Sequence, residues 1–265
     1  MNEDMLKEFI SDPALAATVS ETDALRKDLV GMRIFDAPIF AIAAADDPLF
    51  LRLKSDASVG AHHLLPADWT PGARFVLSVF FPFAKRVRAA NAAADRIPAA
   101  EWLHGRIEGQ KCISAVFAAA AEVLRRAGFS AVVPALDARF RSEGFTSNWS
   151  ERHVAFVCGL GTFGLSRGLI TEKGIAGRFA SLVTDMALSP TRREYEDLYE
   201  YCVFCGLCAK RCPAEAIDPE TGKAHAPCFT FLEETRARFS PRYGCGKCQA
   251  GVPCECGIPA RGARS

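Results

Sequence analysis

The sequence predicts an α+β fold in two parts, a larger region over residues 1–195 and a smaller one over residues 196–265. Two observations support this division. In the first part, apolar residues recur at helical spacing in some segments and form short strand-like runs in others. In the second part, the composition changes, because nine of the eleven cysteines lie from residue 202 onward. At 265 residues and 49% hydrophobic composition, the chain can bury a proper core.

The elements of the first part follow from local patterns. Apolar positions three and four residues apart predict helices over residues 5–10 and 14–29. Residues 38–45 and the Phe- and Val-rich run 75–83 predict buried strands. An alanine-rich helical pattern extends over residues 98–128, and the glycine that ends it is typical of a helix C-terminus.

The second part contains the cysteine spacing of a bacterial ferredoxin. In that spacing, three thiolates two residues apart converge on one cubane iron–sulfur cluster, and the fourth, followed by proline, points to a second cluster. The residues are Cys202, Cys205, Cys208, Cys212 and Pro213. The spacing therefore predicts an electron-carrying protein.

The remaining cysteines allow two complete clusters. We expect a first [4Fe–4S] cluster on Cys202, Cys205, Cys208 and Cys254, and a second on Cys212, Cys228, Cys245 and Cys248. Cys256 is the alternative to Cys254, because both thiols lie within reach of one backbone turn. Pro253 restricts the approach of the residue after it, which favours Cys254.

Other uses of cysteine fit less well. A disulfide framework belongs to small secreted domains, whereas residues 1–4 are polar and do not resemble a signal peptide. Zinc sites use isolated pairs of cysteines, not three thiols in succession followed by Cys-Pro.

Charge and hydropathy narrow the cellular setting. With 32 basic and 31 acidic residues the chain does not resemble a dedicated nucleic-acid binder. We interpret the basic groups at residues 85–88 and at Arg261 and Arg264 as solvated surface. No apolar run is long enough to cross a bilayer, so we expect a cytoplasmic protein without membrane partners.

A glycine motif, Gly159-x-Gly161-x-x-Gly164, matches a dinucleotide-binding pattern, and Asp185 follows at a suitable distance. The neighbouring residues argue against dinucleotide binding, because such a motif follows a strand and opens a helix. Here residues 153–158 are equally compatible with the end of a helix, and the motif leads into a turn. The glycines indicate close backbone approach to some group. Nearby, we expect Trp149 and Phe163 to line a cofactor cavity.

Several segments together resemble a known family. These are residues 152–164 and 174–185, the ferredoxin run, Cys228 with the Phe-Leu-Glu that follows it, and residues 243–249. In this order they resemble the epoxyqueuosine reductases, which are relatives of the reductive dehalogenases. The resemblance covers roughly residues 65–256, and its most specific element is the cysteine spacing.

The resemblance implies a nitroreductase-like cobalamin-binding domain followed by a ferredoxin-like domain with two [4Fe–4S] clusters. Electrons from an external low-potential donor of the ferredoxin or flavodoxin type would pass through the clusters to the cobalamin, which reduces an organic substrate. On this interpretation Gly159, Gly161 and Gly164 lie against the corrin. The competing interpretation is a ferredoxin-type electron-transfer protein that holds no cobalamin, or holds a flavin.

The sequence departs from the family at two points. Where the family has an acidic residue proposed as proton donor, this chain has Phe145, and the nearest acids are Glu143 and Asp137. Glu143 is the candidate donor, although its polar surroundings also suit an exposed loop. Longer members carry a helical-repeat extension that helps to hold tRNA, and the chain ends at Ser265. We therefore expect a small-molecule or modified-nucleoside substrate and regard tRNA itself as doubtful.

Overall fold

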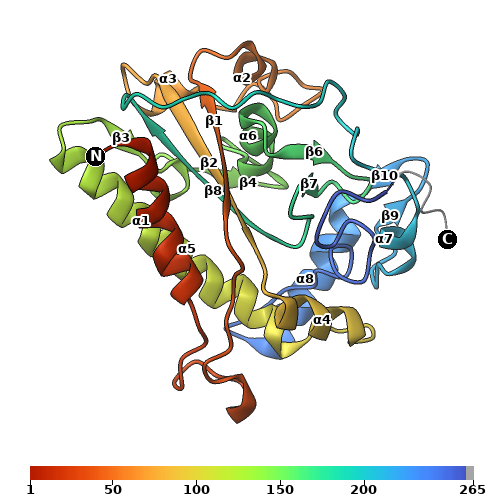
Figure 1. Cartoon of the computed structure of the whole chain (residues 1–265). Helices are drawn as coiled ribbons and strands as arrows, with labels where there is room; N and C mark the ends of the chain where they lie inside the picture. Colours follow the sequence, from red (N-terminus) through yellow and green to blue (C-terminus); the bar gives the residue numbers. More distant parts are fainter. Residues whose placement is uncertain (261–265) are drawn as a thin grey trace.

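The computed structural model describes residues 1–260. The interpretation of Arg261 and Arg264 as solvated surface lies outside the described residues, as does the end of the predicted second part. Helices and strands are mixed through the first part of the chain, which confirms the α+β prediction at that level (Figure 1). Among residues 1–260, no helix is both long and apolar enough to span a bilayer.

A four-stranded antiparallel sheet forms the centre of the first part. Its strand order is β1 (Ile39–Ala44), β2 (Phe75–Pro82), β8 (Gly177–Thr184) and β3 (Ala131–Val132). Strand β2 is central and almost wholly buried, because both of its faces are covered. Its side chains alternate between two cores, as the period of a strand requires.

Helices cover both faces of this sheet. Helices α1 (Glu3–Ala16) and α5 (Ala100–Arg126) pack together on one face, and α6 (Glu151–Cys158) packs on the other (Figure 1). The face under α5 buries Leu77 and Val79 of β2, whereas the face under α6 buries Val76 and Phe80. The result is an antiparallel sheet between two helical layers, so that each face of the sheet buries its apolar side chains.

The remaining elements are short, apart from one helix in the second part. A 3-10 turn at Lys27–Leu29 precedes β1. Between the main strands lie α2 (Pro48–Arg52), α3 (Pro66–Trp69), α4 (Lys85–Ala93), a 3-10 turn at Pro134–Leu136, the β4 (Ser142–Glu143) and β5 (Thr146–Ser147) hairpin, and the β6 (Gly161–Phe163) and β7 (Leu169–Thr171) hairpin. The second part contains α7 (Leu207–Lys210), the pair β9 (Ile217–Asp218) and β10 (Gly222–Lys223), and α8 (His225–Phe239).

One predicted helix is wrong. The segment 14–29 is helical only at its two ends, because α1 continues through Pro13 to Ala16 and the chain then pairs with residues 31–34. The Val19 N–H donates to the Met32 carbonyl, and the Gly31 N–H donates to the Val19 carbonyl. Tertiary pairing therefore overrides the helical spacing of the apolar residues.

The end of the described chain docks on the first part. The Ile175 N–H donates to the Cys254 carbonyl at 2.9 Å, and a Cβ on Gly174 would lie only 2.3 Å from the Glu255 carbonyl oxygen. Only glycine therefore fits at position 174. This contact fixes the C-terminal segment (residues 252–257) against the loop that enters β8.

Candidate functional site

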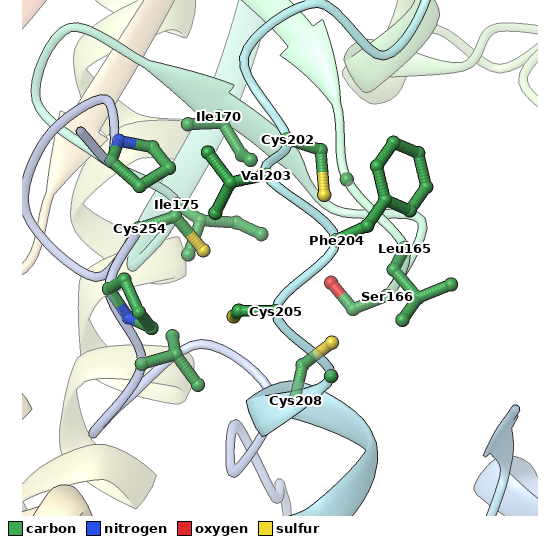
Figure 2. Close-up of a pocket in the computed structure, with 15 residues that line it drawn as sticks. Leu165, Ser166, Ile170, Ile175, Cys202, Val203, Phe204, Cys205, Cys208 and Cys254 are labelled. Carbon is green, nitrogen blue, oxygen red and sulfur yellow. The ribbon is translucent and has the colours of Figure 1, made fainter. Parts of the chain in front are cut away.

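Four cysteines from distant parts of the sequence line one cavity. Three belong to the ferredoxin run and its short helix α7, and the fourth comes from the C-terminal segment (Figure 2). The cavity walls are otherwise largely apolar, and Ile170 and Ile175 from the β6–β7 side complete them. The four cysteines are Cys202, Cys205, Cys208 and Cys254.

The local backbone explains how the first three thiols converge. Phe204 and Gly206 both have positive φ, at 49° and 73°, so the chain turns sharply on either side of Cys205. Gly206 then forms the N-cap of α7, which carries Cys208. The two left-handed residues thus coil the chain around the cavity.

The structure separates the two candidates for the fourth position. Cys254 lines the cavity, and the hydrogen bond from Ile175 holds its backbone in place. Cys256 does not line it and is exposed to solvent. The geometry thus favours Cys254 as the fourth thiol.

The other four predicted cysteines line a second cavity. Cys212 follows α7, Cys228 lies in the first turn of α8, and the remaining two lie in the loop after α8, at Cys245 and Cys248. The Ala216 N–H donates to the Cys212 sulfur at 3.3 Å. Hydrogen bonds of this kind tune the potential of an iron–sulfur cluster.

Hydrogen bonds to Asn91 and Ala94 in the first part of the chain hold the loop that carries Cys245 and Cys248. Lys247 is 1% exposed, and its Nζ donates to the Asn91 and Ala94 carbonyls at 2.9 and 2.7 Å. The Asn91 amide in turn donates to the Cys245 carbonyl at 2.9 Å. These supporting residues were not identified from the sequence, because only their tertiary contacts distinguish them.

Two alternatives to an iron–sulfur cluster are disulfide bonds and a site for a single metal ion. All eleven cysteines lie within the described residues, and none forms a disulfide. Across residues 1–260, no three His, Cys, Asp or Glu side chains gather as ligands of a single metal ion.

Burial raises the pKa of the Cys208, Cys245 and Cys254 thiols to about 12, and neighbouring thiols add to the effect. Metal ligation requires thiolates, so binding of a cluster at these sites would release protons.

A larger cavity lies beside the second cysteine group. It contains about 1430 Å³ of space not filled by atoms, including space open to solvent. Its walls come from α5, β8, the start of α6 and residues 133–140. It shares three wall residues with the second cysteine cavity: Arg106, Arg152 and Gln249. The charges of Cys228 and Cys248 also act on the Arg152 guanidinium, whose pKa is lowered by burial.

An acid that the sequence analysis did not select lines the large cavity. Glu151 stands in the first turn of α6, and neither of its buried carboxyl oxygens has a hydrogen-bond partner of ordinary geometry among the described residues. A helix N-terminus favours a charged acid, but burial dominates and raises the pKa of Glu151 to about 7, although nearby Ser181 opposes the shift. Glu143, the acid selected from the sequence, is exposed on the β4–β5 hairpin and does not line this cavity.

The predicted cofactor-binding residues separate into different sites. Trp149 lines the large cavity, and its indole N–H donates to the Ser181 hydroxyl at 2.8 Å. Phe163 is buried in the core under α6, against the ring of His153, and lines none of the described cavities.

The three glycines have structural explanations of their own. Gly159 is the left-handed C-cap of α6. A Cβ on Gly161 would lie 1.9 Å from the Ile170 carbonyl oxygen across the β6–β7 hairpin, and Gly164 lines the first cysteine cavity near Cys202. The motif thus follows a helix and leads into a strand, the reverse of the dinucleotide-binding order. The glycines do not form the floor of the large cavity.

Comparisons with known proteins agree with this geometry. Residues 196–218 match the model of the 4Fe-4S binding domain family. The trichloroethene reductive dehalogenase of Dehalococcoides mccartyi is 31% identical over 75 residues, which are 27% of this chain and 14% of that protein. The tetrachloroethene reductive dehalogenase of Desulfitobacterium hafniense is 40% identical over 68 residues, 25% of this chain and 12% of that protein. The chain therefore spans a small part of these relatives.

Solved structures share the fold at low identity. Epoxyqueuosine reductase from Streptococcus thermophilus has a TM-score of 0.51 and 14% identity over 82% of this chain and 62% of that chain. The catabolic reductive dehalogenase NpRdhA in complex with 3-bromo-4-hydroxybenzoic acid has a TM-score of 0.54 and 16% identity over 98% of this chain and 37% of that chain. The chain is thus an iron–sulfur protein with a 4Fe-4S binding region and the fold of epoxyqueuosine reductases and reductive dehalogenases.

Proposed function

We propose that this protein is an iron–sulfur oxidoreductase of the epoxyqueuosine reductase type. In this proposal, Cys202, Cys205, Cys208 and Cys254 hold one [4Fe–4S] cluster, and Cys212, Cys228, Cys245 and Cys248 hold a second. Electrons from an external low-potential donor pass through the clusters to a cobalamin in the large cavity, where an organic substrate is reduced. The division into a cofactor-binding part, residues 1–195, and a cluster-binding part is proposed with it.

The observation that carries this proposal is the shared wall between the second cysteine cavity and the large cavity. Arg106, Arg152 and Gln249 line both spaces, so a single layer of side chains separates them. The first cysteine cavity touches the large one only through Ile175. This arrangement favours the second cluster as the immediate donor to a group in the cavity.

The residues of the large cavity fit a bulky cofactor with polar edges. The space is large, Trp149 offers a flat apolar wall, and Glu151 and Arg106 have buried polar atoms without partners among the described residues. Ligand sites of this kind combine apolar walls with a few polar groups. When bound there, cobalamin would supply the strongly reducing metal centre that cleavage of carbon–oxygen or carbon–halogen bonds requires.

Within this proposal, Glu151 takes the proton-donating role for which Glu143 was the sequence-based candidate. With a pKa of about 7, a large share of the Glu151 carboxyl groups carries a proton at neutral pH. The proton resides on a buried carboxyl oxygen that faces the cavity, where it can reach a reacting group on a bound substrate. Trp149 supplies an apolar surface in the same space.

The test uses protein that is purified without oxygen and reconstituted with iron and sulfide. We expect about eight iron and eight sulfide per chain, as two cubanes require, and a corrin absorption spectrum after incubation with cobalamin and removal of excess. Full iron with no bound corrin would leave the electron-transfer alternative, and a flavin spectrum would identify its flavin-binding form.

A cysteine variant tests whether electrons reach the cobalamin through the second cluster. C228S removes a ligand of the second site, whereas C112S changes a half-buried thiol on α5 outside both cysteine cavities and serves as the matched control. We expect C228S to bind cobalamin yet to lose its reduction by the external donor, while C112S retains both. Normal reduction of the corrin in C228S would contradict the route.

A further inference from the structure

One end of the large cavity is strongly cationic. There, Arg178 of β8 and Arg106 of α5 line both the cavity and an adjoining opening, as do Gln110 and Ser114, and Tyr243 lines the opening. The Arg178 guanidinium donates two hydrogen bonds to Gln110 Oε1, at 3.0 and 2.6 Å. The Arg106 guanidinium lies 4.4 Å from the centre of the Tyr243 ring. Both positive groups are therefore held in fixed orientations.

Neither arginine has an acidic partner in the part of the chain that the structure describes. No carboxylate oxygen of residues 1–260 lies within 4.0 Å of a guanidinium nitrogen of Arg106 or Arg178, and the Arg106 Nε is buried without a hydrogen bond. The neighbouring Arg242 shows the usual arrangement, because it pairs with Glu108 at 3.0 Å. Both arginines are half-buried, and a charge taken out of water is costly unless it is paired. An anion at this end of the cavity would supply the pairing.

The surrounding groups do not supply that charge. Glu151 lines the same cavity, but burial raises its pKa to about 7, so its negative charge is incomplete at neutral pH. Lys111 lines the opening and adds a further cation, although it contacts Glu108 at 3.5 Å. Burial lowers the pKa of Arg178 to about 10, and the charges of Arg106 and Arg152 add to this effect, whereas Tyr243 and Glu151 oppose it only in part. An anionic ligand would relieve this repulsion.

We propose that Arg106 and Arg178, with Gln110 and Ser114, form a subsite that binds a carboxylate or phosphate group. The planar guanidinium group suits oxyanions because it can donate two parallel hydrogen bonds to two oxygens. Apolar Ile113 and Phe117 of the same helix also line the cavity, so the ligand carries an apolar body beside its anionic group.

The anion has two chemical sources: the phosphodiester of a bound cobalamin, or a carboxylate or phosphate on the substrate. In both cases the guanidinium groups of Arg106 and Arg178 would bind the oxyanion in the same manner. The inference goes beyond the proposed function, because the subsite can bind an oxyanion whether or not a corrin is present.

The first experiment measures binding of inorganic phosphate to the cluster-containing protein by calorimetry at low ionic strength. We expect saturable binding that R178Q and R106Q each weaken by about tenfold or more, since a charge-assisted contact is lost. R178K keeps the charge but loses the two-pronged geometry, and it should fall between R178Q and the parent protein. R125Q is the control, because Arg125 lies on the same helix and pairs with Glu122.

Folding of each variant is checked by circular dichroism and iron content, and R106Q and R178Q alter different elements. A folding defect confined to α5 or to β8 therefore cannot explain weaker phosphate binding in both variants. If phosphate does not bind, or if R106Q and R178Q bind it as tightly as R125Q does, the subsite is refuted.

A second experiment distinguishes the sources. Protein is loaded with cobalamin or with cobinamide, a corrinoid without the phosphodiester, and phosphate binding is measured again. Displacement of phosphate by cobalamin alone assigns the subsite to the cofactor, and phosphate binding that persists with both assigns it to the substrate. If neither corrinoid binds while the parent protein still binds phosphate, the subsite stands and the proposed cobalamin function fails.

Discussion

Replacement of Glu151 by glutamine should change how the stability of the protein depends on pH. Burial raises the pKa of Glu151 from 4.5 to about 7. Because the folded state binds this proton more tightly than the unfolded state, the stabilising contribution of the protonated acid is fully present below pH 4.5. It is lost as the pH rises toward 7. A shift of this size corresponds to roughly 3 kcal/mol.

Glutamine has nearly the same shape and carries no titrating proton. Relative to the parent protein, E151Q should therefore gain roughly 3 kcal/mol between pH 4.5 and pH 8. For a chain of this size, that gain corresponds to a rise of roughly 6 °C or more in the midpoint of thermal unfolding. Oxygen-free melting curves recorded by circular dichroism at several pH values measure the difference.

E143Q is the matched control, since Glu143 is an exposed acid eight residues earlier. Its melting curves should follow those of the parent protein at every pH. Parallel curves for E151Q and the parent protein would mean that Glu151 titrates like an ordinary acid. In that case the assignment of a neutral, proton-carrying Glu151 would be wrong.

Three further predictions concern other parts of the molecule. C254S should lose about half of the bound iron and C256S should keep it, as measured by iron analysis, because Cys254 lines the first cysteine cavity and Cys256 does not. Equal iron in both variants would refute the choice of Cys254. G161A should lower the free energy of unfolding by roughly 2 kcal/mol or more, since its Cβ would lie 1.9 Å from a carbonyl oxygen; an unchanged melting midpoint would contradict the clash. E108Q should cost roughly 3 kcal/mol by denaturant unfolding, because it breaks a buried ion pair; a loss of less than about 1 kcal/mol would show that the pair adds little.

Short-range patterns predicted much of the fold. The Phe- and Val-rich run became β2, the strand over 38–45 became β1, and the alanine-rich stretch became α5, because each pattern agrees with its final packing. Gly128 directly follows the C-cap of α5 and has φ of 90°, as a residue beyond a helix end often does.

The errors come from long-range contacts. Residues 17–34 form a loop that pairs with itself, which no helical periodicity reveals. Strand β8 was not predicted, although it lies next to β2 in the sheet, because it begins with a glycine and an arginine and Ser181 breaks its short apolar run.

In the candidate site, too, local patterns were predicted and residues that depend on long-range contacts were missed. The cysteine spacing is a local signal of high specificity, and eight cysteines line two cavities, four in each. The acid in the large cavity could not be predicted from the family pattern, because the position of the family's acid falls on Phe145 in this sequence. Phe145 instead stacks on His225 at 5.3 Å. The burial of Glu151 depends on β8 and α5, which only the tertiary structure brings together.

The docking of the C-terminal segment on Ile175 has a consequence for biosynthesis. The ribosome makes Cys254 about fifty residues after Cys202, and the backbone that carries it is placed only when it meets the loop before β8. Until then, the first cysteine group has three members and an open side. With the proposed ligand set, the first cluster would be completed only after this segment has docked, so assembly of the metal centre would coincide with closure of this part of the fold.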